Sequence, residues 1–173
     1  MSFFEDYAVG ESVELGRHLF TAEDIVRFAS AFDPQPFHVS EEGAARSHFG
    51  RLAASGWHTA AVWMRLNVEH RKRRLAEAAE RGVRMGRFGP SPGFDEMKWL
   101  KPVYVGDVIA FRSTVRDKRD WPSRPGWGLI IQYAEGFNQA GERVFSFIGH
   151  VLVERRAPAA APEAAAVSDA SRA

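Results

Sequence analysis

The feature that most constrains the fold is a long segment that begins at Gly56 and is apolar on nearly all sides as far as Val68. It lacks the alternation of a strand, so it predicts a helix that other elements cover on most sides. From Glu69 to Arg81 the residues become charged, which indicates that the end of this helix reaches solvent. Such a helix requires a broad apolar surface on which to pack.

That surface is predicted to be a β-sheet, formed mainly by the residues that follow the helix. A breaker segment at 89–93 separates the two, and beyond it the hydrophobic period changes to that of strands. Because helices precede most of the strands, the order favours an α+β fold with an antiparallel sheet over alternating βαβ units. The predicted strands span 12–20, 94–101, 106–118, 127–138 and 142–155.

A shorter helix over 22–32, capped by Thr21, is predicted ahead of the long one. Pro34 and Pro36 must end it, because proline lacks the backbone N–H and disfavours helical conformation in the residue before it. The segment 33–39 is therefore predicted to be a stiff loop.

The length of 173 residues suits one domain, which we place at residues 1–156. The remainder, 157–173, is rich in Ala and Pro and is predicted to be disordered, because it cannot bury enough apolar surface to order itself.

The composition excludes several classes of function. The absence of cysteine rules out a disulfide framework, a thiolate nucleophile and a cysteine metal site. The six histidines lack the spacing of a metal site. A net charge of +1 gives no footprint for nucleic acid or a membrane surface. Without a signal peptide or an apolar stretch of roughly 20 residues, the predicted location is the cytoplasm.

Asp33 and His38 are the first candidates for catalysis, because the prolines near them would hold two proton-transfer groups in a fixed relation. Histidine gives or takes a proton near neutral pH, and a neighbouring carboxylate can fix its tautomer or act as its partner acid or base. The alternative is that Asp33 only terminates a helix and His38 is a surface histidine.

The start of the long helix is the second candidate. A helix N-terminus presents unpaired N–H groups and partial positive charge. Gly56 would let a ligand approach the backbone closely, and a thioester oxygen placed there would be stabilised as negative charge develops. The alternative is an ordinary helix start with Ser55 as its N-cap.

Three segments together resemble the MaoC-like dehydratase family, which includes the (R)-specific enoyl-CoA hydratases. The resemblance extends from about residue 5 to about residue 155. The segments are FDPQPFH at 32–38, LAASGWH at 52–58 and PGFDEMKWLKPVYVGD at 92–107.

This resemblance implies a hotdog fold, in which an antiparallel sheet wraps a long central helix. It implies a homodimer or dimer of dimers, with the acyl-thioester tunnel at the interface. Asp33 and His38 would hold a catalytic water that adds syn across the 2,3-double bond, and the Gly56 amide would bind the thioester carbonyl. Coenzyme A or pantetheine would enter as part of the substrate, with no metal or redox cofactor. Ser55 and Trp57 would contact the substrate.

Two positions depart from the family pattern. Gln35 and Pro36 would support the catalytic loop, but the family usually has Asn where this chain has Gln35. Some hydratases also carry a serine near the active site five residues after the motif glycine, where this chain has Ala61.

Other residues carry weaker signals. His58 could face the pocket, but a polar residue near a helix end is the favoured interpretation. The basic residues at 71–74 could contact the phosphates of coenzyme A, since the planar guanidinium of arginine can donate two hydrogen bonds to one phosphate. The favoured interpretation is that they form a solvated helix end. Three apolar residues of the long helix, Trp57, Trp63 and Met64, are predicted to pack in the core. For Trp57 this is an alternative to the substrate contact given above.

Two other functions stay open. A thioesterase is possible on a hotdog fold, although a carboxylate and a histidine sharing one loop favour hydration. A non-catalytic acyl-thioester binding subunit is the other alternative, and the intact pair of Asp33 and His38 argues against it.

Overall fold

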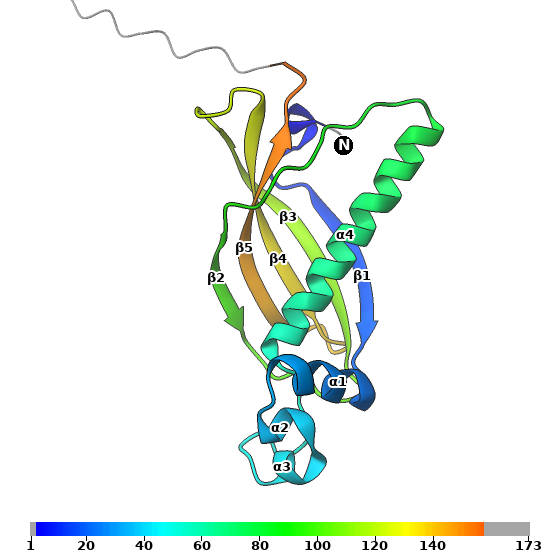
Figure 1. Cartoon of the computed structure of the whole chain (residues 1–173), viewed down its shortest axis with the longest axis vertical. Helices are drawn as coiled ribbons and strands as arrows, with labels where there is room; N and C mark the ends of the chain where they lie inside the picture. Colours follow the sequence, from blue (N-terminus) through cyan, green and yellow to red (C-terminus); the bar gives the residue numbers. More distant parts are fainter. Residues whose placement is uncertain (1–2, 158–173) are drawn as a thin grey trace, which may run out of the picture.

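The computed structural model describes residues 3–157, so all but the first residue of the predicted tail lies outside the described residues. In the described part, the chain forms one antiparallel sheet, a long helix that runs diagonally across it, and three shorter helices gathered at one end (Figure 1). This is the predicted α+β arrangement, and it is the hotdog fold.

The sheet has five strands, and every pair of neighbours is antiparallel. All five predicted strands are confirmed, with ends that move by a few residues. In spatial order the strands are β1 (Ser12–Leu19), β3 (Val108–Asp120), β4 (Trp127–Phe137), β5 (Arg143–Glu154) and β2 (Phe94–Trp99). The long central strands β3, β4 and β5 contribute Phe111, Ala134 and Phe145 to the core in which the first half of α4 packs.

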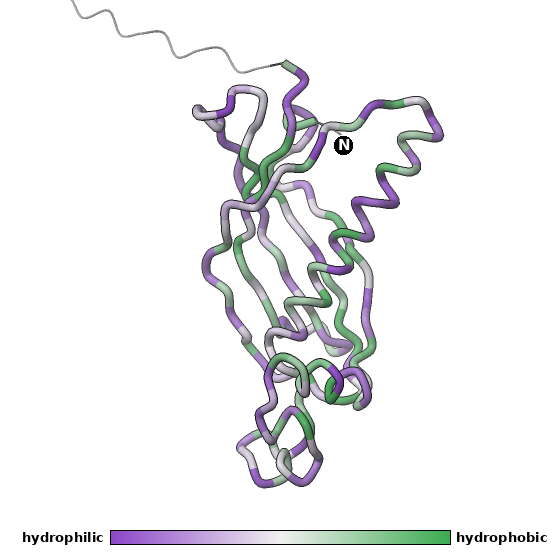
Figure 2. Tube along the Cα trace, viewed as in Figure 1, coloured by the Kyte–Doolittle hydropathy of each residue, from purple (hydrophilic) through white to green (hydrophobic). Residues whose placement is uncertain are grey.

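The predicted long helix is α4 (Gly56–Glu80). Its first half buries Val62, Trp63 and Leu66 in the main core, together with sheet residues such as Phe111 and Phe145. Beyond its midpoint α4 is largely hydrophilic (Figure 2), because this half is only partly covered. The prediction that Trp63 packs in the core is confirmed.

Met64 was also predicted to be a core residue, and this is wrong because its side chain is half exposed. A helix laid on one open sheet buries one face, and Met64 lies on the other face. Trp57, Val68 and Leu75 are exposed on α4 as well.

The segment between α1 (Ala22–Phe32) and α4 differs from its prediction. Residues 33–39 were predicted to be a loop, but Pro36–Val39 form a short helix, α2, followed by α3 (Glu41–Ala45). Pro36 occupies the first helical position, where the missing N–H costs nothing and the fixed backbone angle favours a helix. Proline ends α1 as predicted, and it then starts the next helix.

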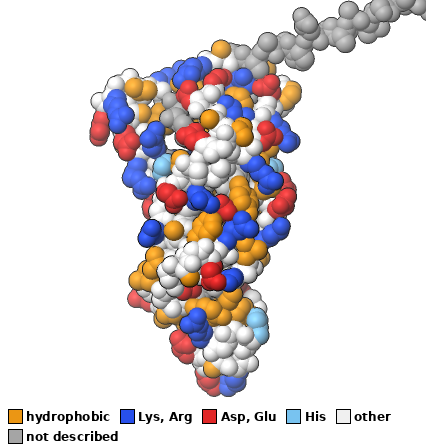
Figure 3. Space-filling view, turned by 180° about the vertical axis from the view of Figure 1, so that it is seen from behind, with side chains coloured by type: hydrophobic (Ala, Val, Ile, Leu, Met, Phe, Trp, Pro, Cys, Tyr) orange, Lys and Arg blue, Asp and Glu red, His pale blue; other side chains and the backbone are white. Residues whose placement is uncertain are grey.

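The face turned away from the viewer of Figure 1 carries Lys and Arg side chains interspersed with Asp and Glu (Figure 3). None of the helices among residues 3–157 has the length and apolarity that a membrane crossing requires.

Candidate active site

Asp33 is placed by the end of α1. Its backbone N–H donates to the Ala29 carbonyl at 2.8 Å, which closes the last turn of the helix, and its own carbonyl accepts from the Gln35 N–H at 2.8 Å. Asp33 is therefore held by backbone bonds on both sides, and its side chain points away from α1 toward the start of α4.

Two side chains donate hydrogen bonds to the Asp33 carboxylate. The Ser55 hydroxyl donates to Oδ2 at 2.7 Å, and the Gln35 amide donates to Oδ1 at 2.8 Å. Burial raises the pKa of Asp33, but these two hydrogen bonds and the nearby His38 outweigh it and hold the pKa below its usual value. Asp33 is therefore ionised at neutral pH. The longer amide of Gln35 does reach the carboxylate, so this departure from the family pattern preserves support for the loop.

His38 lies in α2 and is almost fully buried. Its Nδ1 is 2.7 Å from the Ala53 carbonyl oxygen, and its Nε2 is 3.5 Å from Asp33 Oδ2. A carbonyl only accepts, so Nδ1 donates a proton to it, and Nε2 is the ring nitrogen that faces Asp33. The surface-histidine alternative is thereby excluded. The backbone of Ala53 fixes the tautomer, and the carboxylate lies beside the free nitrogen.

The start of α4 leaves one N–H group open. Ser55 caps the helix by accepting from the Trp57 N–H at 3.2 Å, and its carbonyl accepts from His58 and Thr59. Among the described residues, no acceptor is found for the Gly56 N–H. The N–H groups of the first turn therefore have hydrogen-bond acceptors, except that of Gly56, which is the amide predicted to bind the thioester carbonyl.

Packing gives a further reason for glycine at position 56, beside the predicted approach of a ligand. A Cβ atom there would lie 2.5 Å from the Trp99 indole, so glycine allows β2 to pack directly on the helix start. Trp57 meets the same indole edge to face, at 5.2 Å between ring centroids, and is half exposed. Its predicted place in the core is therefore wrong.

A cavity of about 440 Å³ connects these groups. Asp33, His38 and Gly56 all line it, and so do Gln35 and Trp57. Ser55 and Pro36 lie behind the wall, where Ser55 holds Asp33 and Pro36 starts the helix that carries His38. The remaining wall comes from α2, the turn after α3, the start of α4, the end of β2 with the segment after it, and β5. Its residues are Phe37, His48, Phe49, Ala54, Thr59, Trp99, Leu100, Lys101, Pro102, Val103 and Val144.

Several wall residues were not predicted. Trp99 and Lys101 lie inside the 92–107 segment, but no spacing rule connects that segment with the loop at Asp33. His48 reaches the cavity because α3 ends at Ala45 and the chain then turns. These contacts depend on the tertiary arrangement, and local sequence patterns carry no signal for them.

Other candidates lie elsewhere. His58 and Ala61 line a separate pocket on the far side of α4, with His18 and Phe28. The favoured interpretation of His58, a residue outside the site, is supported, and a serine at position 61 would not face Asp33. The basic residues 71–74 lie on the distal half of α4 and are largely exposed, as the solvated-end interpretation predicts, except that Arg71 is half-buried. In residues 3–157, no cluster of three or more His, Asp or Glu side chains is placed to hold a metal ion.

Comparison with known proteins supplies independent information. A family model described as a MaoC like domain matches residues 6–125, which is more than half of the chain. The solved structure of a MaoC-like dehydratase from Rhodospirillum rubrum is 37% identical in sequence, with a TM-score of 0.73, and the match covers 90% of this chain and 98% of that chain.

Two curated relatives extend the comparison. An uncharacterised protein of Bacillus subtilis, YdeM, is 29% identical over 155 residues, which cover 87% of this chain and 98% of the relative. A mesaconyl-CoA hydratase of Cereibacter sphaeroides is 40% identical over 73 residues, which cover 40% of this chain but only 21% of the relative. The match to the hydratase therefore concerns a local segment of a much longer protein.

Proposed function

The chain belongs to the MaoC-like dehydratase family, and on that premise we propose that it adds water across the 2,3-double bond of an enoyl thioester or removes it from the 3-hydroxyacyl thioester. One observation carries the proposal. An ionised carboxylate, the free nitrogen of a buried histidine and an unpaired helix N–H all face one cavity. These are the parts that reversible hydration next to a thioester needs.

In this proposal a water molecule sits between Asp33 and His38. The Asp33 carboxylate and the His38 Nε2 lone pair are both acceptors, so together they accept both hydrogens of the water and aim its oxygen lone pair at C3 of the substrate. The lowered pKa makes Asp33 a poor proton acceptor at neutral pH, which leaves Nε2 of His38 to take the proton as the C–O bond forms.

The thioester carbonyl is proposed to bind at the Gly56 N–H. When water attacks C3, the electron pair of the double bond moves toward the carbonyl, and an enolate oxygen forms there. The Gly56 amide and the positive end of α4 stabilise that charge. Nε2 of His38 then returns a proton to C2. Asp33 and His38 then have the same protons as before the reaction, and the product has gained one H at C2 and one OH at C3.

The substrate class is proposed to be a thioester of coenzyme A or of a pantetheine-bearing carrier protein, with an (R)-3-hydroxyacyl product. Two findings support it, the family membership and the local similarity to a mesaconyl-CoA hydratase. The apolar wall contributed by Phe37, Phe49 and Val103 suits an acyl group.

We further propose a homodimer. Among the described strands, β2 has a neighbour on one side only, and the exposed residues Phe94, Trp99 and Leu100 lie in or just after it. α4 presents Trp57, Met64, Val68 and Leu75 on its exposed face. Apolar surface of this extent is typical of a partner interface. Analytical ultracentrifugation at several concentrations would contradict the dimer if it gave only the mass of one chain.

The proposed reaction is tested with a panel of short to medium trans-2-enoyl-CoAs and their 3-hydroxyacyl counterparts, following the absorbance of the conjugated double bond. We expect turnover by the wild type, an (R)-3-hydroxyacyl product, and a fall of about 10²- to 10⁴-fold for Asp33→Asn. A fully active Asp33→Asn variant would refute the assignment. Release of free thiol in place of a hydroxyacyl thioester would show that the protein is a thioesterase.

A further inference from the structure

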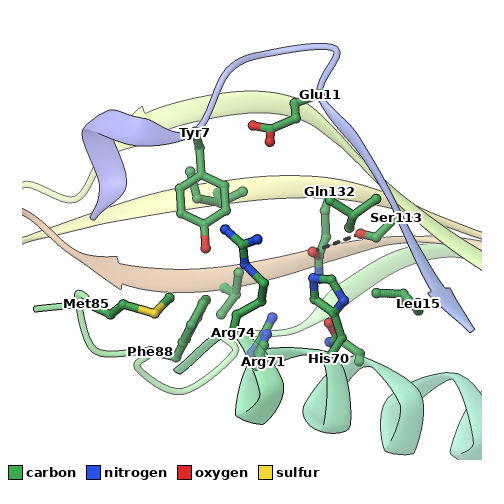
Figure 4. A pocket seen from close by; sticks show the side chains of 14 residues that line it. Tyr7, Glu11, Leu15, His70, Arg71, Arg74, Met85, Phe88, Ser113 and Gln132 are labelled. Atoms are coloured by element: carbon green, nitrogen blue, oxygen red, sulfur yellow. Dashed lines mark hydrogen bonds between the residues drawn. The ribbon is translucent and has the colours of Figure 1, made fainter. Parts of the chain in front are cut away.

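A second cavity, of about 290 Å³, lies between the distal half of α4 and the sheet. It does not share a residue with the cavity that holds Asp33 and His38. About 22 Å of helix separates Gly56 from Arg71, at 1.5 Å per residue. Figure 4 shows the side chains of Tyr7, His70 and Arg74 directed toward the same space from opposite sides.

Arg71 is the group in this cavity that most requires an explanation. Its guanidinium is half-buried, and among the described residues no carboxylate lies within 4 Å of it. The guanidinium carbon lies 4.2 Å from the centroid of the Phe88 ring, and Arg71 also interacts electrostatically with Tyr7. Burial lowers the pKa of Arg71, because removal from water disfavours the charged guanidinium. A guanidinium without an anion at such a site favours an anionic ligand.

The neighbouring charges make the cavity cationic. Arg74 also lines it and has only an exposed, weak contact with Glu77, at 3.9 Å. Glu11 lies on the wall, but its carboxylate accepts from the Ala8 backbone instead of pairing with an arginine. Burial and then the nearby arginines lower the pKa of His70, so His70 is neutral at pH 7 and adds no charge of its own.

The floor of the cavity is polar and partly unsatisfied. Asn67 is 5% exposed, lines the cavity, and has no hydrogen-bond partner for its side chain among the described residues. The Ser113 hydroxyl, which also lines the cavity, donates to the Gln132 side-chain oxygen at 3.1 Å (Figure 4). An amide that is open to a cavity and has no protein partner can hydrogen-bond a ligand that enters it.

The remaining walls are apolar, and Tyr7 adds one more polar group. Burial raises the pKa of Tyr7 to about 12, so the phenol keeps its proton and can donate a hydrogen bond. A volume near the lower end of the range for ligand pockets suits a small molecule with an apolar body. The apolar residues are Val13, Leu15, Met85, Phe88, Ile130 and Val151.

We infer that this cavity is a binding site for a small amphipathic carboxylate, distinct from the proposed thioester site. The carboxylate binds the guanidinium of Arg71, with Arg74 and the Tyr7 hydroxyl as further donors. The chain or ring of the acid lies along the apolar walls, and Asn67 meets its polar or hydrated end. The inference does not depend on the proposed hydratase activity.

Isothermal titration calorimetry of the full chain with octanoate tests the site, with 1-octanol as the uncharged probe of matched chain length. We expect octanoate to bind at least about tenfold more tightly than octanol. Arg71→Gln should weaken octanoate binding by about tenfold to a hundredfold and leave octanol binding unchanged. Lys72→Gln is the matched control, because it removes one positive charge from the adjacent, exposed position on the same helix.

Two outcomes overturn the inference. One is equal affinity of the wild type for octanoate and octanol, or no binding of octanoate. The other is an equal loss of octanoate binding in Arg71→Gln and Lys72→Gln, which would assign the effect to general charge. If Arg71→Gln does not fold, the affinities of the wild type for octanoate and octanol still show whether the cavity prefers a carboxylate. Asp33→Asn should bind octanoate as the wild type does, so failure of the hydratase proposal would leave this result standing.

Discussion

His38 and His58 lie on opposite sides of the start of α4 and are almost equally buried, at 5% and 7% exposure. Their surroundings differ. His38 has a carbonyl on Nδ1 and a carboxylate facing Nε2, and it lines the cavity with Gly56. His58 stacks on the ring of Phe28 at 4.6 Å, and its buried Nδ1 has no hydrogen-bond partner among residues 3–157.

The comparison teaches that burial alone does not make a histidine catalytic. At His38 a carbonyl and a carboxylate lie beside the two ring nitrogens and orient the ring toward the cavity. At His58, burial and then His18 lower the pKa to about 4, so the ring resists protonation near neutral pH. One histidine is arranged for proton transfer, and the other is a packed ring whose charging would disturb the fold.

The largest expected effect is the loss of activity when His38 is replaced. His38→Gln removes the proton acceptor while the Gln amide can still donate to the Ala53 carbonyl. We expect hydration rates to fall by about 10²- to 10⁴-fold with little change in the free energy of unfolding. Steady-state kinetics and urea denaturation would measure both. His58→Phe, the matched change on the other side, should keep the rate within about twofold of the wild type.

The next effect concerns stability at acid pH. The folded-state pKa of His58 lies below its reference value of 6.5, so the unfolded chain binds the proton first. His58 therefore lowers the free energy of unfolding as the pH falls from about 6.5 toward about 4. We expect a loss of roughly 2 kcal/mol, less than the full shift implies because the neighbouring pocket admits solvent.

His58→Phe should remove that contribution, because a phenyl ring can stack on Phe28 and cannot take a proton. Urea denaturation of the variant and the wild type at pH 7 and at pH 4.5 measures it. Identical pH dependence in the two proteins would show that His58 is not charged in this range in either state.

A smaller effect is expected from Gln35, which holds the carboxylate of Asp33 beside His38. Gln35→Ala deletes one hydrogen bond to Asp33 and should raise the pKa of that carboxyl. We expect a rate at neutral pH that is reduced by about two- to tenfold. Because a depressed carboxyl pKa keeps Asp33 ionised above that pKa, the acid limb of the pH–rate profile should move to higher pH. Gln35→Asn tests whether a shorter amide still holds the carboxylate, and an unmoved acid limb in Gln35→Ala would exclude the role.

The smallest expected effect is that of Glu41→Gln. Glu41 lies close to His38 in sequence, in the first turn of α3, where its charge favours the positive helix end. We expect about 0.3–1 kcal/mol less stability and an unchanged rate. A large loss of rate would show that the electrostatics around α2 extend beyond the pair, which would weaken the comparison with His58.

The fold was largely predictable from the sequence because its signals are local. The apolar run after Gly56 and the breaker at 89–93 mark the long helix and the change to strands. Two of the errors share one cause, because local patterns do not show which face of a helix is covered. Met64 and Trp57 are apolar and belong to the buried-looking run, yet the single sheet covers the opposite face.

The candidate site was predictable only in part. Asp33 and His38 share a short segment, so their proximity follows from the chain itself. The hydrogen bond from Ser55 joins residues 22 positions apart, and the contact of Trp99 with Gly56 joins β2 to α4. Such contacts arise from packing between elements and leave no periodicity in the sequence.

The Ser55 hydroxyl caps α4 and also donates to Asp33, and this double role matters to anyone who would transplant the site. A graft that moves only the 33–38 segment onto another hotdog scaffold would carry the acid and the base but leave behind the atom that orients one of them. The smallest portable unit is that segment together with residues 53–56, because the Ala53 carbonyl holds His38 and the Ser55 hydroxyl holds Asp33. Selection for a firmly anchored helix in such a chimera would, through this hydroxyl, select for a correctly aimed carboxylate as well.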